Sequence, residues 1–234
     1  ISRIKILNKQ VNFRKFFLHQ SINNLVSIQN TLKIEKKDSN QTKIIAVSKT
    51  FPINEILPLI NHGQVHFGEN KVQEALEKWQ LIKQDFKHLQ LHMIGKLQSN
   101  KVKFVVGLFD YIHSLDSLKL AKKISEEQKK FKKKIKIFIQ INIGKESQKN
   151  GIDEAELDEF HKICINELEL DIIGLMCLPP QNGDTKKYFS KMKNLAERIG
   201  VKELSMGMSN DYLEAAKYGA TYVRIGSKIF GNRN

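Results

Sequence analysis

Residues 44–50 read IIAVSKT, and this short stretch contains the pattern that decides the fold. Four apolar residues are followed at once by Ser48, Lys49 and Thr50. A short apolar run bounded by polar residues is typical of a strand that is buried on both faces, as in a parallel sheet. The same texture returns along the chain at 65–68, 89–95, 111–115, 135–142, 172–177, 203–207 and 221–226.

Segments with a helical spacing of apolar residues separate these runs. They cover 53–61, 70–83, 118–131, 154–168, 188–199 and 211–218, and a longer amphipathic helix is expected at about 12–33. Strands that alternate with helices predict an α/β fold with a parallel sheet. A single (β/α)8 TIM barrel with an extra N-terminal helix closes such a sheet, and a doubly wound open sheet is the alternative. We expect residues 1–234 to form one domain, because no linker or low-complexity tract interrupts the pattern.

The charge of the chain invites a nucleic-acid partner, but its composition argues against one. The net charge is +14 and the pI is about 9.6. Only five of the 39 basic residues are arginine, the residue that reads phosphates and bases with two hydrogen bonds at once. Lysine is scattered over the whole chain, and no nucleic-acid-binding motif accompanies it. We therefore expect no nucleic-acid partner, with a basic nucleic-acid binder as an alternative.

Cysteine use and hydropathy indicate the cytoplasm. Cys164 and Cys177 form neither a CxxC pair nor a disulfide framework, and both are expected to be buried small hydrophobic residues. No apolar run approaches the roughly 18 residues that a membrane helix needs. The first ten residues, ISRIKILNKQ, lack the apolar core of a secretory signal. We expect a cytoplasmic protein with no membrane partner.

Polar and glycine-containing clusters follow the apolar runs at their carboxyl ends. They lie at 48–50, 68–70, 95–100, 142, 205–209 and 224–227. The carboxyl ends of the strands of a barrel share one face, where barrel enzymes place their sites. These clusters are therefore expected to line a single site.

The last two clusters have the composition of a phosphate-binding cup. Ser209 follows the seventh run, and Gly226 and Ser227 follow the eighth. Glycine lets the backbone approach an anion closely, and short hydroxyl side chains add donors. Residues 226–231 are expected to begin a short helix whose free N–H groups face the phosphate. An ordinary tight turn has the same composition and is the alternative.

Lys49 is the residue with the sharpest chemistry. Its position after an apolar strand places the ammonium at the barrel mouth, beside a dry interior. Desolvation lowers the pKa of a lysine and exposes the nucleophilic amine that a Schiff base needs. The alternative is a lysine whose stem covers apolar surface while its charge stays in water. A Schiff-base lysine together with a phosphate cup points to pyridoxal 5′-phosphate (PLP), whose aldehyde and phosphate lie at opposite ends of a small ring.

Two histidine pairs have the i, i+4 spacing that binds zinc on a helix. In the pair His62 and His66, Gly63 intervenes across a helix end. The pair His88 and His92 leads along a strand, where four residues span about 13 Å, too far to share one metal. We expect no metal site.

These motifs resemble the pyridoxal phosphate homeostasis proteins, single-domain relatives of the alanine racemase barrel. The matching segments span nearly the whole chain in order. They are IIAVSKT (44–50), HFGENKVQEA (66–75), HMIGKLQSNK (92–101), QIN (140–142), KNGI (149–152), GLMCLPP (174–180), LSMGMSNDYLEAA (204–216) and GATYVRIGSKIFGNR (219–233). Ser227 stands where threonine is usual, which keeps the hydroxyl, and Phe51 stands where a basic residue is often found.

The resemblance implies a protein that binds PLP and keeps vitamin B6 in balance, without an established reaction of its own. It implies that Lys49 bonds to the PLP aldehyde and that Arg224 faces the pyridine nitrogen. The cofactor-binding residues that it implies are Lys49, Asn70, Met206, Ser209, Arg224, Gly226 and Ser227. Met208 is also expected to pack around the cofactor.

An arginine at the pyridine nitrogen favours a binding protein over an enzyme. Its own pKa above 12 disfavours protonation of the ring, and an unprotonated ring is a poorer electron sink. The racemase relatives also take a second base from a second domain across a dimer. We therefore expect no catalytic residue and a monomeric carrier whose partners are PLP and PLP-requiring apoenzymes. The alternative is a weak PLP-dependent amino-acid racemase.

Overall fold

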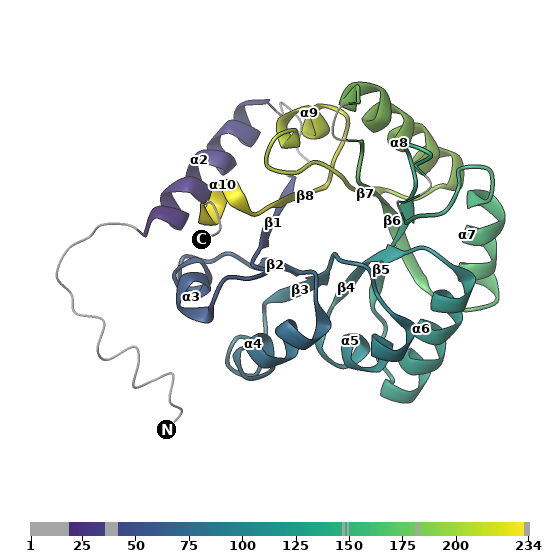
Figure 1. Cartoon of the computed structure of the whole chain (residues 1–234), viewed down its shortest axis with the longest axis horizontal. Coiled ribbons are helices and arrows are strands. Elements are labelled where there is room, and N and C mark those ends of the chain that lie inside the picture. Colours follow the sequence, from purple (N-terminus) through teal and green to yellow (C-terminus); the bar gives the residue numbers. More distant parts are fainter. Residues whose placement is uncertain (1–18, 36–41, 147, 149, 181–182, 232–234) are drawn as a thin grey trace.

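Eight parallel strands form a closed ring in the computed structural model, which describes residues 19–35, 42–146, 148, 150–180 and 183–231. Each strand pairs with its neighbour in sequence, and β8 returns to pair with β1 through Ala46 and Ile225. Figure 1 looks down this ring and shows the helices outside it. The closure confirms the predicted (β/α)8 barrel and excludes the open sheet.

All eight predicted strands are present, and their bounds differ from the prediction by one or two residues at most ends. The strands are β1 (Lys43–Val47), β2 (His66–Glu69), β3 (Gln90–Met93), β4 (Tyr111–Leu115), β5 (Lys136–Ile141), β6 (Asp171–Cys177), β7 (Glu203–Ser205) and β8 (Tyr222–Ile225). Because the strands are parallel, their carboxyl ends lie at one end of the barrel.

The helices alternate with the strands along the chain. They are α2 (Gln20–Glu35), α3 (Ile53–Asn61), α4 (Val72–Asp85), α5 (Val102–Leu108), α6 (Leu118–Phe131), α7 (Leu157–Asn166), α8 (Thr185–Ile199), α9 (Tyr212–Lys217) and α10 (Ser227–Phe230), with a 3-10 turn at Ser99–Lys101. The predicted helix at 12–33 is found from Gln20 onward, and residues 12–18 lie outside the described part of the chain.

Helix α5 is absent from the sequence prediction. Its sequence, VKFVVGL, is short and rich in valine, which favours strands. Val102, Val105 and Val106 are nevertheless buried, which is the spacing of one helical face. Packing of this face therefore overrides the local preference of the residues.

Two sets of buried side chains stabilise the barrel. Ile45, Tyr111, Phe138, Met176 and Tyr222 form one cluster. These five residues come from five different strands around the ring, so they can meet only inside it. The larger cluster fills the layer between the strands and the surrounding helices, where Phe67 of β2 packs on Trp79 of α4 at 5.0 Å between ring centroids.

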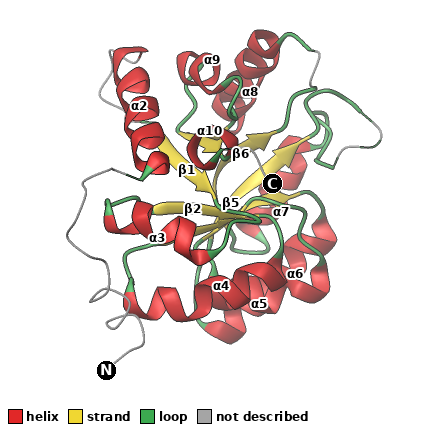
Figure 2. Ribbon diagram, turned by 60° about the vertical axis from the view of Figure 1, so that its left-hand side comes forward, coloured by secondary structure: helices red, strands yellow, loops and turns green. Residues whose placement is uncertain are grey.

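Helix α2 covers the seam between β8 and β1. The helix that follows β8, α10, is only four residues long. Leu25, Ile28 and Leu32 of α2 are buried, and Asn24 Nδ2 donates to the carbonyl of Ile229 in α10 at 3.0 Å. Figures 1 and 2 both show α2 beside this part of the barrel. The N-terminal helix thus supplies the cover that α10 is too short to give.

Candidate functional site

Lys49 lies in a turn directly after β1, at the carboxyl end of the barrel. The side chains of Lys43 and Ile45 point into the barrel, since they contact Tyr222 and the interior cluster. Lys49 is partly buried, and Thr50 adopts a φ of 69° that closes the turn. The structure therefore places Lys49 at the barrel mouth, as predicted from the apolar run before it.

Polar contacts fix this turn on both sides of Lys49. The Ser48 carbonyl accepts hydrogen bonds from Lys78 Nζ at 2.9 Å and from the Phe51 amide at 3.1 Å. On the other side, the Thr50 amide donates to a carboxylate oxygen of Glu74. Burial raises the pKa of Glu74, but its hydrogen bonds from Thr50 and Lys78 outweigh burial and lower it overall. The backbone around Lys49 is thus held to α4.

A buried carboxylate also stabilises the turn that contains Lys49. Glu69, at the end of β2, is fully buried, and its Oε1 accepts from Ser48 Oγ at 2.7 Å, Lys78 Nζ at 3.0 Å and Trp79 Nε1 at 2.9 Å. Lys78 also reaches Glu74 at 2.9 Å. A buried charge is tolerated only when it is paired and hydrogen-bonded. Lys78 supplies that pairing.

The two predicted phosphate-binding loops meet each other. Ser227 Oγ lies 3.0 Å from Ser209 Oγ, which joins the loops after β8 and β7. Gly207 has a φ of 90°, and a Cβ there would lie 2.5 Å from that of Ala215, so only glycine lets the β7 loop pack on α9. The predicted short helix is α10, which begins at Ser227.

The cup lies next to the Lys49 turn. A Cβ at Gly226 would be 3.4 Å from the Val47 carbonyl oxygen, so the ends of β8 and β1 are in contact. The rings of Phe51 and Phe230 stack with centroids 4.6 Å apart. The segment after Lys49 therefore packs on the helix that follows Ser227.

Arg224 is buried beside these loops, with only 4% of its surface exposed. Its Nη1 donates to the Ser205 carbonyl at 2.7 Å and to Ser205 Oγ at 2.6 Å, and its Nη2 donates to the Cys177 carbonyl at 2.8 Å. Burial lowers the pKa of Arg224, but a guanidinium stays charged in proteins. These bonds leave at most two of its five donors for a ligand.

Asn70 retains bonding capacity at the edge of the site. It follows β2, and its side-chain oxygen is buried without a hydrogen-bond partner among the described residues. A Cβ at Gly95 would lie 2.3 Å from the Asn70 carbonyl oxygen, so the loop after β3 needs glycine to pass it. The side-chain oxygen of Asn70 can therefore accept a hydrogen bond from a ligand or from an ordered water.

The two methionines predicted near the cofactor differ in exposure, whereas both cysteines are buried. Met206 is completely buried within the large core cluster, whereas Met208 is 42% exposed. Both cysteines are buried, and burial raises the pKa of each thiol to about 12. The prediction that both cysteines are buried is confirmed, and burial disfavours the thiolate form that acts as a nucleophile.

Sequence spacing missed how the histidines are arranged. His66 pairs with His92 across β2 and β3, and His92 pairs with His113 of β4, while His88 is exposed before β3. The spacing of histidines within one segment does not indicate these contacts. The register of β2 and β3, in which Gly68 lies opposite His92, does indicate the contact between His66 and His92. No group of His, Cys, Asp and Glu suited to a metal ion occurs in the described residues.

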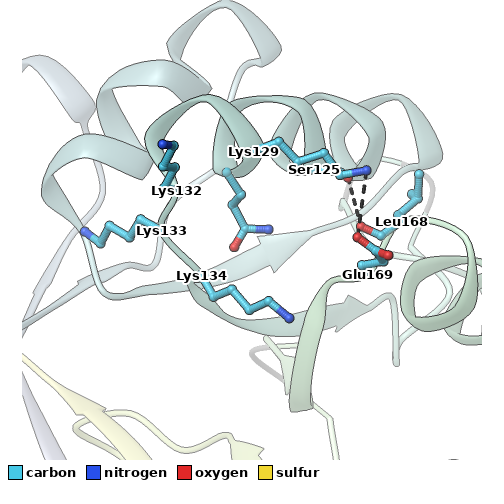
Figure 3. Close-up of a pocket in the computed structure, with 8 residues that line it drawn as sticks. Ser125, Lys129, Lys132, Lys133, Lys134, Leu168 and Glu169 are labelled. Atoms are coloured by element: carbon cyan, nitrogen blue, oxygen red, sulfur yellow. Dashed lines mark hydrogen bonds and ion pairs between the residues drawn. The ribbon is translucent and has the colours of Figure 1, made fainter.

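A separate pocket of about 240 Å³ lies at the end of the barrel opposite to Lys49. Figure 3 shows the side chains that line it. The pocket sits between the end of α6 and the loop that leads into β6. Its lining residues are Ser125, Gln128, Lys129, Lys132, Lys133, Lys134, Leu168 and Glu169. Ser125 Oγ donates to the Leu168 carbonyl at 2.8 Å, and Lys129 reaches Glu169 at 3.9 Å. These lysines are therefore not part of the Lys49 site.

Comparisons with known proteins agree with this architecture. The family model for the alanine racemase N-terminal domain matches residues 24–234. An alanine racemase from Clostridium difficile superposes with a TM-score of 0.70 at 17% identity, over 92% of this chain and 57% of that one, which shows the fold. The fold, together with the residues at the carboxyl ends of its strands, thus defines the protein as an alanine racemase-type barrel.

Closer relatives specify the family. Proteins named pyridoxal phosphate homeostasis protein from Pasteurella multocida and Haemophilus influenzae are 38% and 39% identical, over 89% and 88% of this chain and 94% and 92% of theirs. PipY of Synechococcus elongatus, in a structure with PLP bound, superposes with a TM-score of 0.81 at 33% identity over 91% of this chain and all of that one. The chain belongs to the pyridoxal phosphate homeostasis protein family.

Among the described helices, none combines the length and the apolar character needed to cross a bilayer.

Proposed function

We propose that this chain binds PLP and keeps its intracellular supply in balance, with Lys49 bonded covalently to the PLP aldehyde. The observation that carries the proposal is the convergence of the Lys49 turn, the Ser209–Ser227 pair and the buried Arg224 at one end of the barrel. Membership in the family and the PLP-bound relative support the choice of ligand.

Each residue has a role that fits its surroundings. Ser209, Gly226 and Ser227 hold the phosphate, because their loops offer hydroxyl groups and a close backbone approach. Arg224 donates to the pyridine nitrogen with donors that Ser205 and Cys177 do not use. Asn70 lines the pocket with an unpartnered amide oxygen, and Met206 supports it from the core.

The chain acts as a carrier, not as an enzyme. PLP supplies an aldehyde and a ring that withdraws electrons when the ring nitrogen is protonated. Arg224 holds that nitrogen unprotonated because the guanidinium does not give up its proton at neutral pH. We propose that residues 1–234 work as one cytoplasmic, monomeric domain without a catalytic residue, which exchanges PLP with PLP-requiring apoenzymes.

Mapping of the covalent bond tests the proposal. The Lys49 amine adds to the aldehyde carbon with release of one water, and borohydride reduction makes the bond permanent. We expect peptide mass spectrometry of the PLP-loaded, reduced protein to find the adduct on Lys49 and the Lys49→Ala variant to lose the visible absorption band. Lys134→Ala, in the pocket at the opposite end, is the matched control and keeps both.

Two results would overturn the proposal. An adduct on another lysine, or none after loading, removes the role of Lys49. Sustained racemisation of an amino acid that Lys49→Ala abolishes makes the protein an enzyme instead.

A further inference from the structure

A line of hydrogen bonds crosses the interior of the barrel from β2 to β8. His66 Nδ1 lies 2.9 Å from His92 Nε2, and His92 Nδ1 lies 2.9 Å from His113 Nε2. His113 Nδ1 is 2.8 Å from Ser205 Oγ, to which Arg224 Nη1 donates at 2.6 Å. The line connects five strands and ends at the arginine beside the ligand site.

Arg224 sets the direction of this line. A guanidinium only donates, so Ser205 Oγ accepts from it and has one proton of its own to give. If Ser205 gives that proton to His113 Nδ1, then His113 carries its hydrogen on Nε2 and donates to His92. His92 in turn carries its hydrogen on Nε2 and donates to His66. Every contact then contains one proton.

The opposite direction is less favourable. Ser205 Oγ would accept twice and would have to send its own proton elsewhere, although Ser205 is completely buried. A buried donor that loses its acceptor costs free energy. The outward direction, from Arg224 to His66, avoids this cost.

The surroundings keep the three imidazoles neutral, as this arrangement requires. His92 and His113 are fully buried, and burial lowers the pKa of both well below the ordinary value. Burial, together with the charges of Lys43 and Lys136, lowers the pKa of His66 to about 4, while Asp110 opposes this shift. An additional proton would place two hydrogens in one contact.

We propose that His113 and Ser205 are positioning residues, and that the one-way line of Nε2–H histidines behind them holds the Arg224 guanidinium in place for the ligand. When the Ser205 proton points to His113, the lone pairs of Ser205 face Arg224. Without His113, the hydroxyl is free to turn its proton toward the guanidinium. The proposal rests on the proposed function in one respect, that the ligand of Arg224 is PLP.

Nitrogen NMR of the PLP-free protein tests the line itself. Long-range proton–nitrogen correlations distinguish Nε2–H, Nδ1–H and charged imidazoles. At pH 7 we expect the neutral Nε2–H form for His92 and His113, and a shift of the His113 Nδ1 signal in Ser205→Ala. His88→Gln, an exposed control, leaves these signals unchanged. An Nδ1–H or charged His113 would overturn the proposal.

PLP affinity tests the positioning role. Because hydrogen bonds to charged groups are among the stronger ones, we expect Ser205→Ala and His113→Phe to weaken PLP binding about tenfold. His113→Asn restores part of the loss, since its amide oxygen takes the place of Nδ1 as an acceptor. Equal losses in His113→Phe and His113→Asn, with both variants folded by circular dichroism, would contradict the role.

The two experiments separate this inference from the proposed function. If PLP fails to bond to Lys49, the proposed function fails, while the tautomers of the PLP-free protein still decide the direction of the line. If PLP binds but His113 carries Nδ1–H, only the present inference fails.

Discussion

Lys78 connects a buried charge to the turn that presents Lys49. Its ammonium contacts Glu69, Glu74 and the Ser48 carbonyl, and its side chain is only 9% exposed. An ion pair of this kind contributes little net stability by itself, but removal of one partner leaves the other buried without compensation. The position of Lys49 therefore depends on a second lysine, which contacts the turn through the Ser48 carbonyl.

Loss of Lys78 should be costly for this reason. We expect Lys78→Ala to lower the free energy of unfolding by about 3 kcal/mol, because Glu69 is left buried and charged. Urea denaturation measures the change. The control is Lys193→Ala, a lysine paired with Glu197 on the exposed face of α8, which should change stability by less than about 1 kcal/mol. Equal losses in the two variants would refute the argument.

Gly95 offers a test of the contact between two loops of the site. A methyl group there would meet the backbone of Asn70 at 2.3 Å, which side-chain motion cannot relieve. We expect Gly95→Ala to displace Asn70 and weaken PLP binding at least tenfold in a titration followed by absorbance. Gly107→Ala, in α5, has its nearest neighbour at 3.4 Å and should stabilise the protein by up to about 1 kcal/mol with unchanged binding.

Local sequence predicted those residues whose roles depend on one strand end. IIAVSKT predicted β1 and the position of Lys49 at the barrel mouth, and the residues after β7 and β8 were expected to share one cup; Ser209 and Ser227 do lie in contact. The support behind them was not predictable in this way. Glu69 contacts Lys78 because β2 packs on α4, and His66 contacts His92 because of the register between β2 and β3. Such partners are set by tertiary structure, not by spacing along the chain.

Helix α2 contributes to the fold by covering one part of the barrel. It closes the seam between β8 and β1 and contacts α10, which begins at Ser227. Periodicity predicted this helix because one face is apolar, whereas α5 was missed because its valines favour strands. A helix with a long amphipathic pattern was therefore predictable, whereas a short helix of residues with low helix propensity was not.

The cover that α2 provides can be measured by truncation of its buried face. Leu25 is fully buried, and we expect Leu25→Ala to lower the free energy of unfolding by about 2–5 kcal/mol, since it leaves a cavity over the seam. Ile34→Ala on the same helix, with the residue 78% exposed, should have almost no effect. Thermal unfolding of the two variants decides whether α2 is a structural part of the barrel, and a matching small shift in both would contradict it.

The molecule as a whole carries three neutral histidines inside its barrel, and this makes its stability depend on pH. Unfolded histidines have a pKa of about 6.5. The folded pKa of His66 is lowered to about 4, and complete burial lowers the pKa values of His92 and His113 well below the ordinary value. Below pH 6.5 the unfolded chain therefore binds more protons than the folded barrel. The stability that these three histidines contribute is therefore fully present above pH 6.5 and is lost as the pH falls toward 4.

Each of these histidines adds a slope of about 1.4 kcal/mol per pH unit once the pH is well below 6.5. We expect urea midpoints measured from pH 7.5 to 4.5 to be constant at first and then to fall steeply, because these three histidines and His161, whose pKa is also lowered by burial, take up protons on unfolding. His66→Gln should reduce the slope by about one such increment, because only the outermost member of the line is replaced. His88→Gln, which changes an exposed histidine, should preserve the full slope. Midpoints that stay constant down to pH 5 would mean that the interior imidazoles accept protons without strain, and the neutral line through the barrel would then be wrong.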